Sequence, residues 1–315
     1  MTRSVLQVLG PSTGGIRRHV ATLADGLEDR GWTTTVAGPP GVMDGLRDGQ
    51  VNVPVSNRPS VAGLRSLRSL AREADVVHAH GLTAGWWSWL AGAGDRLVLT
   101  VHNLVLREAS GRATPILRAA EGLLPARAAE TIVISDEMRR RFDPSGTDRT
   151  ITLIPPVGPV PVVSRSASEV RAELGIDAQA PLVVLVGRLH PQKDIGTLID
   201  AVDSLPGSTQ VVVVGDGPDR ERLSQRITAL GLEERVHLVG ARADAADFQA
   251  AADVVVMCSI WEGFGLVVAE ALALGKPVVA TAVGPVPSMV IDRETGRLVT
   301  PSDPAALGAA ITDLL

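Results

Sequence analysis

Short apolar runs alternate with amphipathic segments along almost the whole chain of 315 residues. Each run has the length of a strand and is bounded by glycine, proline or aspartate. The runs are almost continuously hydrophobic, which is typical of parallel strands buried on both faces. Strands that alternate with helices predict a parallel sheet covered by helices on both sides. The expected fold class is therefore α/β.

This pattern occurs twice, with a break at residues 155–168. The first half carries apolar runs at 4–10, 33–38, 75–80, 96–102, 130–135 and 150–155, with helices expected at 17–30, 60–73 and 115–124. The second half carries runs at 181–188, 209–217, 235–241, 253–259, 276–284 and 296–301, with helices expected at 195–204, 219–230, 244–252 and 265–274. The break holds four prolines and has no helical period, which indicates an extended linker. We therefore expect two doubly wound domains, residues 1–160 and 161–315, with a ligand cleft between the carboxyl ends of their strands.

Composition excludes several classes of protein. Charged residues make up 21% and hydrophobic residues 45%, as in ordinary globular proteins, so a disordered tail or a polybasic nucleic-acid binder is not expected. No apolar run has the roughly 18 residues that span a bilayer. The single cysteine, Cys258, excludes an internal disulfide and a multi-cysteine zinc site, and it is expected to be a buried, inert thiol. These features favour a cytoplasmic location.

Membrane contact is a further hypothesis for the first half, where 18 arginines exceed 15 acidic residues. Trp86, Trp87 and Trp89 are close in sequence, and they predict either helix packing or an apolar platform for a lipid-linked acceptor or a membrane surface. Arg139, Arg140 and Arg141 likewise indicate either a solvated helix face or phospholipid contact. We therefore keep two expectations: a cytoplasmic protein without membrane contact, or one that associates peripherally with the cytoplasmic face of a membrane.

The segment WEGFGLVVAEALALGK, residues 261–276, carries the most chemical information. It indicates a strand end, a turn flanked by glycines, and a helix. The helix start at Gly265 and Leu266 offers unpaired backbone N–H groups and a positive dipole, which suit a diphosphate. Glu270 lies on an otherwise apolar helix and needs a partner, either ligand hydroxyls or a nearby arginine.

Two basic residues follow the strand predicted at 181–188. Arg188 lies at the carboxyl end of this strand, and Lys193 precedes the next helix. A guanidinium and an ammonium group at these positions would clamp two phosphates. The loop GDGP follows the next strand, and Gly217 would let the backbone approach a ligand, although a plain turn before a helix explains it equally well.

In the first half, Gly14 and Gly15 join a buried strand to a helix, so this loop too can lie close to a ligand. The spacing is not that of the dinucleotide fingerprint. His78, His80 and His102 lie at the carboxyl ends of two strands. Three histidines suggest a metal, but no adjacent aspartate, glutamate or cysteine completes a site, so we expect no metal.

Taken with these motifs, the chain resembles the retaining glycosyltransferases of family 4. Glu262 and Glu270 have the spacing of the family's EX7E signature, which is its most specific match. VGRLHPQKD, VVVVGDGP, GKPVVATAVG and TGRLVTPSDP match further, while GGIRRHV, DVVHAHG and TVHN resemble motifs of the acceptor side. The resemblance implies the GT-B fold, in which two Rossmann-like domains face each other across a cleft. The nucleotide sugar would bind the second domain and the acceptor the first.

The resemblance also implies the reaction: a sugar moves from a nucleoside-diphosphate donor, expected to be a UDP-sugar, with retention and without a metal or other cofactor. Arg188 and Lys193 would hold the diphosphate and stabilise it as the leaving group. Glu262 would contact the donor sugar and Glu270 the ribose. The other implied contacts are backbone amides near Phe264, Gly265 and Leu266 for the phosphates, Gly217 for the donor, His102 near the reacting sugar, and Gly14 and Gly15 beside donor and acceptor.

Several positions depart from the family pattern. Residues 154–157 read IPPV where the family has an IPNG-type stretch, and residues 284–288 read GPVPS where it has GG-I-P-E. Asp194 follows Lys193 where the family has glycine. The family's C-terminal return helices are not found, which suggests a fragment. Two alternatives follow: an epimerase or phosphorylase of the same fold, or a truncated or degenerate module that binds a nucleotide sugar without turnover. A glycan, a lipid-linked molecule or a small molecule would each suit as acceptor.

Overall fold

The computed structural model describes residues 2–11, 15–43, 50–56, 60–104, 114–148, 150–155 and 160–315. The chain divides into two compact units, Met1–Pro156 and Val157–Leu315. Each unit is a parallel α/β sheet with helices on its faces, so the predicted fold class is confirmed.

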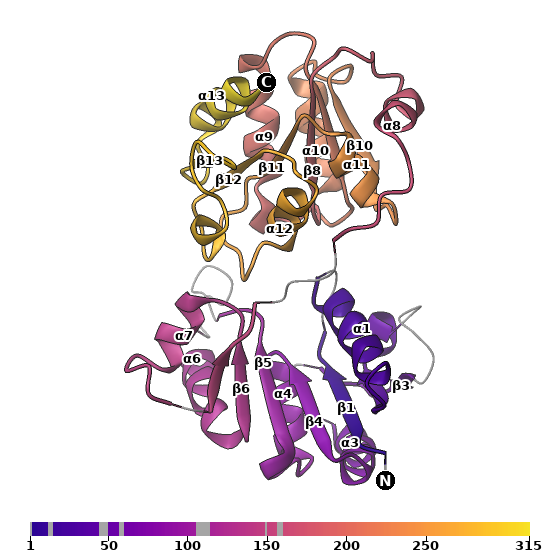
Figure 1. Ribbon diagram of the computed structural model, residues 1–315, viewed down its shortest axis with the longest axis vertical. Coiled ribbons are helices and arrows are strands. Elements are labelled where there is room, and N and C mark those ends of the chain that lie inside the picture. The colour runs from indigo at the N-terminus through magenta and orange to yellow at the C-terminus, as the bar shows by residue number, and fades with distance from the viewer. Residues whose placement is uncertain are drawn as a thin grey trace. The chain divides into compact units, whose positions relative to one another are not determined.

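The N-terminal unit is built on one sheet, seven-stranded within the described residues, in the order β3-β2-β1-β4-β5-β6-β7. All its neighbouring strands pair in parallel. Figure 1 shows β6, β5, β4 and β1 side by side in this order. The strands are β1 Ser4–Leu9, β2 Thr33–Gly38, β3 Gln50–Asn52, β4 Val76–His80, β5 Leu97–Val101, β6 Glu130–Val133 and β7 Ile151–Leu153. The helices are α1 Gly15–Glu28, α2 Pro40–Met43, α3 Val61–Glu73, α4 Leu82–Leu90, α6 Thr114–Leu123 and α7 Asp136–Phe142.

Helix starts in this unit follow from local side chains. The Ser60 hydroxyl accepts the N–H of Gly63 at the start of α3, and the Ser135 hydroxyl accepts that of Met138 at the start of α7. These bonds satisfy backbone donors that a helix otherwise leaves open. The apolar face of α1 packs with α2 and the sheet through Leu9, Val20, Ala24, Val36, Val42 and Met43.

The tryptophans of α4 have different environments. Trp87 is fully buried, donates its indole N–H to the carbonyl of Ser56 at 2.8 Å, and packs so closely on α3 that a Cβ at Gly63 would lie 2.7 Å from its ring. Its role is therefore helix packing. Trp86 and Trp89 meet edge to face, and the Arg127 guanidinium covers both rings. Within the described ranges, no helix combines the length and the apolar character that a membrane span requires.

The C-terminal unit holds a six-stranded parallel sheet in the order β10-β9-β8-β11-β12-β13. Its strands are β8 Leu182–Val186, β9 Gln210–Val214, β10 Val236–Gly240, β11 Val254–Met257, β12 Val278–Thr281 and β13 Gly296–Val299. Its helices are α8 Ala167–Glu173, α9 Ile195–Ala201, α10 Arg220–Ala229, α11 Ala245–Ala251, α12 Leu266–Ala273 and α13 Pro304–Leu314.

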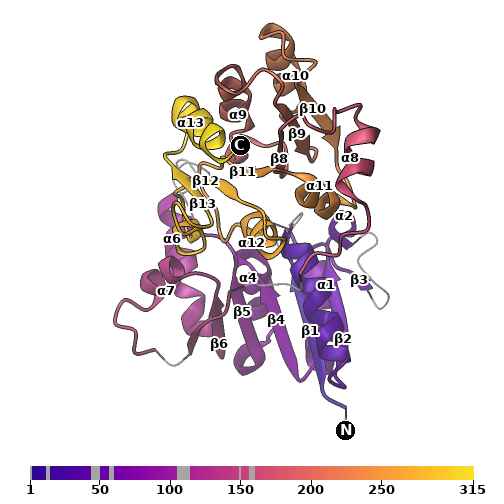
Figure 2. The ribbon, with the colours of Figure 1, turned by 45° about the horizontal axis from the view of Figure 1, so that its top comes forward.

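Two helix layers cover this sheet (Figure 2). Val183 and Leu185 of β8 point into a core with α9, α10 and α13, while Leu182 and Val184 point into a second core with α8, α11 and α12. Side chains of a strand alternate between faces, so an apolar residue at every position of β8 is what two buried faces require.

The predicted linker was too long at its C-terminal end. Helix α8 begins at Ala167 inside it, because Ser166 and Glu169 form a capping box. Residues 160–166 lie in neither a helix nor a strand, and residues 156–159 lie outside the described residues.

Candidate functional site

Both sheets reverse their strand order once, and such switch points are where open α/β sheets bind ligands. In the C-terminal unit the reversal lies between β8 and β11. Arg188 follows β8 and is exposed, and within the described part of the chain it has no ion-pair partner. Its guanidinium is therefore accessible to an anion from solvent.

Lys193 and Glu262 meet at this switch point. The Lys193 ammonium group contacts Glu262 Oε1, and the Ser259 hydroxyl donates to the same oxygen at 2.7 Å. The Lys193 side chain is 21% exposed and that of Glu262 only 9%, so both charges are partly withdrawn from water. The sequence predicted separate roles for these residues, and the structure brings them into direct contact.

Hydrogen bonds connect the loop after β8 with the loop after β11. The N–H of Ile260 donates to the carbonyl of Gln192 at 2.8 Å, and the Gln192 side-chain amide donates to the carbonyl of Trp261 at 3.0 Å. The buried thiol of Cys258 contacts the carbonyl oxygens of Lys193 and Asp194, at 3.2 and 3.4 Å. These contacts fix the positions of the two loops that carry Lys193 and Glu262.

Asp194 stands where the family that this chain resembles has glycine, and its backbone conformation accounts for the exchange. Its backbone has φ 46°, in the left-handed region that glycine adopts most easily and that aspartate tolerates. Its Oδ2 accepts hydrogen bonds from the hydroxyls of Thr197 at 2.8 Å and Ser302 at 2.7 Å. Aspartate therefore adopts a turn that glycine would also adopt easily, and its carboxylate adds two hydrogen bonds.

Gly217 is required by packing. A Cβ at this position would lie 2.3 Å from the carbonyl oxygen of Leu189, and a Cβ at Gly215 would lie 1.8 Å from that of Gly187. The GDGP loop thus packs so closely on the loop that carries Arg188 that neither Gly215 nor Gly217 has room for a side chain. This close contact between backbones accounts for the glycines, and a ligand contact at Gly217 stays a prediction.

Helix α12 begins at the same edge of the sheet. Gly265 precedes it with φ 90°, and no side chain caps the helix. The first-turn amides of Leu266 and Val267 therefore lack a capping side chain, and anion binding by these amides stays a prediction. Phe264 is buried beside them, and Glu270 lies half-buried on the helix.

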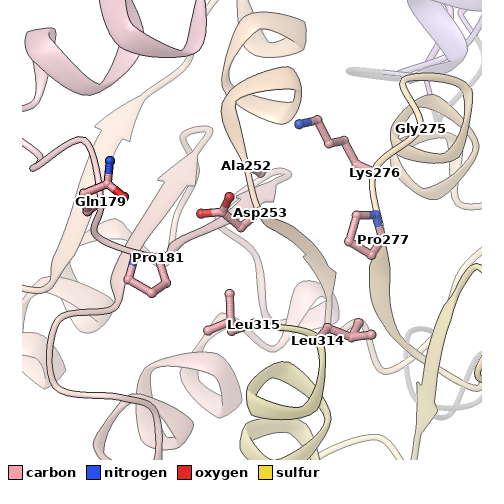
Figure 3. A pocket seen from close by; sticks show the side chains of 9 residues that line it. All are labelled: Gln179, Pro181, Ala252, Asp253, Gly275, Lys276, Pro277, Leu314 and Leu315. Atoms are coloured by element: carbon pink, nitrogen blue, oxygen red, sulfur yellow. The ribbon is translucent and has the colours of Figure 1, made fainter.

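A hollow of about 430 Å³ lies at the opposite edge of this sheet (Figure 3). Pro181, Asp253 and Pro277 line it just before β8, β11 and β12, together with Gln179, Ala252, Gly275, Lys276, Leu314 and Leu315. None of the predicted donor-binding residues is among them. Because ligands of such sheets bind at the carboxyl ends of strands, this hollow is not the candidate site.

The N-terminal sheet reverses its order between β1 and β4. Here His80, at the end of β4, joins a chain of buried polar side chains. His80 Nε2 lies 2.7 Å from Gln7 Oε1, and His80 Nδ1 lies 3.1 Å from His102 Nε2. The adjacent His78 pairs separately with the Thr100 hydroxyl at 2.7 Å.

Helix α1 adds a fourth ring, His19, whose centroid lies 5.9 Å from that of His80 and 5.5 Å from that of His102. Burial is the main cause that lowers the pKa of each histidine here, to about 3 for His78 and His102, and well below the usual range for His80. All four rings are therefore neutral at neutral pH.

In the sequence, an aspartate, glutamate or cysteine was sought beside the three histidines, and His19 was not considered. That residue lies in the GGIRRHV motif, but its position over β4 and β5 depends on how α1 packs. Gln7 and Ser259 were also missed. A glutamine within the apolar run 4–10 was a usable signal, because a buried polar side chain needs a partner. Gly14 lies outside the described residues, and Gly15 begins α1.

Two family models match the chain. Residues 13–157 match glycosyltransferase family 4, and residues 166–315 match glycosyl transferases group 1. Together they span nearly the whole chain and separate within the break between the two units.

Relatives and solved structures agree with these matches. The chain is 34% identical to a D-inositol 3-phosphate glycosyltransferase of Xylanimonas cellulosilytica, over 76% of this chain and 64% of the relative. A protein of the same name from Mycolicibacterium vanbaalenii is 32% identical, over 76% of this chain and 59% of its own. The chain thus spans less than two thirds of these relatives. HepE of Anabaena, solved in complex with UDP-glucose, is 26% identical, with a TM-score of 0.84, and 98% of this chain and 89% of that chain are covered.

Proposed function

Since this chain belongs to the glycosyltransferases of family 4, we propose that it transfers a sugar from a nucleoside-diphosphate donor to an acceptor hydroxyl. The observation that carries the proposal is the cluster at the β8–β11 switch point, where Arg188, Lys193 and Glu262 lie at the carboxyl edge of the sheet. The bond between the anomeric carbon and the diphosphate oxygen breaks, and the acceptor oxygen bonds to that carbon as its hydroxyl proton is released.

The positive groups at this edge support the leaving-group role. The departing nucleoside diphosphate gains negative charge as the glycosidic bond breaks. Arg188 and Lys193 supply fixed positive charge, and the amides at the start of α12 supply oriented dipoles. We extend the proposal to a transfer that needs no metal and retains the anomeric configuration, on the family resemblance.

We propose a UDP-sugar as donor, because HepE has been solved with UDP-glucose, with UDP and glucose, and with UDP. Glu262 would contact the sugar, Glu270 the ribose, and His102 would serve the acceptor side. The names of the relatives make D-inositol 3-phosphate the first acceptor to assay.

Calorimetric titration with UDP, UDP-glucose and GDP tests the donor site without knowledge of the acceptor. We expect UDP to bind more tightly than GDP. Arg188→Ala should weaken UDP binding at least about tenfold, since a hydrogen bond to a charged group contributes roughly 1.5–3 kcal/mol. Glu270→Ala should also weaken it, through the ribose. Arg222→Ala, which changes an exposed arginine of α10, is the matched control and should bind UDP as the wild type does.

Release of UDP from UDP-glucose, with and without candidate acceptors, tests the turnover. Acceptor-dependent release supports transfer. Tight UDP-glucose binding without release, with any acceptor or with water, would instead support a nucleotide-sugar-binding module. Equal binding of UDP by the wild type and by Arg188→Ala would contradict the proposed donor site.

A further inference from the structure

Three imidazoles come together at the switch point of the N-terminal sheet. His19 belongs to α1, His80 ends β4, and His102 follows β5. One ring nitrogen from each lies within 4.8 Å of the other two. We propose that His19, His80 and His102 bind one divalent transition-metal ion, with zinc as the representative case. Sequence reasoning considered His78 in place of His19 and expected no metal.

The ring nitrogens of His80 and His102 lie close to the spacing of two ligands on one ion. Their nitrogens are 3.1 Å apart, whereas two imidazole nitrogens on a tetrahedral zinc are about 3.4 Å apart, from zinc–nitrogen bonds of about 2.0–2.1 Å. Small side-chain rotations would open this separation. The ion would replace the hydrogen bond between the two rings, and the proton of His102 would then reside on Nδ1.

Gln7 supplies the outer contact that such a site needs. Its Oε1 accepts the N–H of His80 Nε2 at 2.7 Å, which leaves His80 Nδ1 with its lone pair facing His102. Histidines that bind metals almost always donate their other N–H to an oxygen acceptor, which fixes the ring orientation and the tautomer. His80 meets this condition without any rearrangement.

The cluster also has the access that binding requires. His80 and His102 are buried, while His19 is partly exposed, which leaves the ion a route from solvent. Three histidines with an open fourth position for water form a known type of zinc site.

Ligand chemistry sets the selectivity. Neutral imidazole suits zinc, copper, nickel and cobalt, whereas magnesium and calcium prefer oxygen ligands. His78 is not part of the set, because the ring nitrogens that lie within 4.8 Å of one another belong to His19, His80 and His102. The site therefore selects late transition metals over magnesium.

Cobalt(II) titration of the untagged, metal-free full chain tests the site through the visible absorption of bound cobalt. We expect one ion per chain, displaced by zinc and unaffected by excess magnesium. His19→Asn, at the partly exposed ligand, should weaken cobalt binding at least about tenfold while the thermal unfolding curve stays that of the wild type. His237→Asn, which removes the half-buried histidine of β10, is the matched control and should bind cobalt normally.

Two results would overturn the inference: no cobalt spectrum at a one-to-one ratio, or equal affinity of the wild type and His19→Asn. Gln7→Leu provides a second variant. It keeps all three ligands but removes the acceptor for His80 Nε2–H, and such losses typically cost about 10–100-fold in metal affinity. The assay contains no nucleotide or acceptor, so its result is independent of the proposed sugar transfer.

Discussion

The ammonium group of Lys193 and the carboxylate of Glu262 form an ion pair that joins the loop after β8 to the loop after β11. The two residues are 69 positions apart, yet β8 and β11 are neighbours in the sheet. In the free protein Glu262 therefore neutralises the positive charge of Lys193, the residue that we propose binds the donor diphosphate. If the donor diphosphate binds Lys193 as proposed, it must share or break this contact.

Glu262→Gln should separate donor binding from turnover. Loss of the carboxylate frees Lys193 and removes a negative charge near the phosphates, so UDP should bind at least as tightly as it does to the wild type. Release of UDP from UDP-glucose should fall about 10²-fold, the scale on which removal of one transition-state contact acts. Calorimetry measures the first quantity and a UDP-release assay the second.

Glu233→Gln is the control for this variant, since Glu233 is exposed and precedes β10, whereas the residues of the candidate site follow the carboxyl ends of β8 and β11. It should change neither quantity. Weaker UDP binding by Glu262→Gln would show that Glu262 holds Lys193 in place for the phosphates, against our expectation.

Asp194 should tolerate glycine better than alanine. Both replacements remove the hydrogen bonds to Thr197 and Ser302, but only alanine keeps a Cβ at φ 46°. A left-handed residue with a Cβ costs roughly 1–2 kcal/mol. The free energy of unfolding of Asp194→Gly, measured by urea denaturation, should therefore be about 1 kcal/mol higher than that of Asp194→Ala. Equal stability of the two variants would show that the turn relaxes.

The strands could be predicted from the sequence because burial on both faces demands apolar residues at every position. Strand β3 was missed, since QVN has one apolar residue among three. The residues of the C-terminal switch point were also predictable, because glycines and charges follow valine-rich strands. Their pairing was not, because it depends on strand order, which places β11 beside β8 while β9 and β10 intervene in the chain.

The histidine cluster shows the same limit. The two strand residues, His80 and His102, have positions set by the parallel register of β4 and β5. The position of His19 is set by the packing of α1 against β1 and β2, through a core cluster that includes Leu9, Val20 and Val36. No local pattern around residue 19 specifies that packing, so the third ligand could be found only from the fold.

Cys258 should be unreactive in the native protein. Burial raises the pKa of its thiol to about 12, and its S–H contacts the Lys193 carbonyl. A thiol reagent at pH about 8 should label nothing in the native state and one thiol per chain in denaturant, where the thiol pKa is about 8.5. Labelling of the folded protein at the rate of the denatured chain would contradict this burial.

The same shift predicts a pH dependence of stability. The folded state holds the thiol proton more tightly than the unfolded state does, so this contribution is complete below about pH 8.5 and is lost as the pH rises towards 12. Urea denaturation should therefore show a decrease in stability between neutral pH and about pH 10. Cys258→Ala, the matched variant, should show a smaller decrease over the same range.

Zinc should inhibit sugar transfer if the histidine site and the proposed acceptor side share His102. A bound ion would occupy the ring nitrogen of His102 and place a positive charge beside the acceptor. UDP release in the presence of UDP-glucose and acceptor should fall on addition of zinc, recover with a chelator, and be insensitive to magnesium.

For His19→Asn, the ratio of rates with and without zinc should move towards one, because the variant binds the ion more weakly. An equal zinc effect on the wild type and on His19→Asn would place the inhibitory ion elsewhere. A wild-type rate unchanged by bound zinc would separate His102 from the acceptor chemistry.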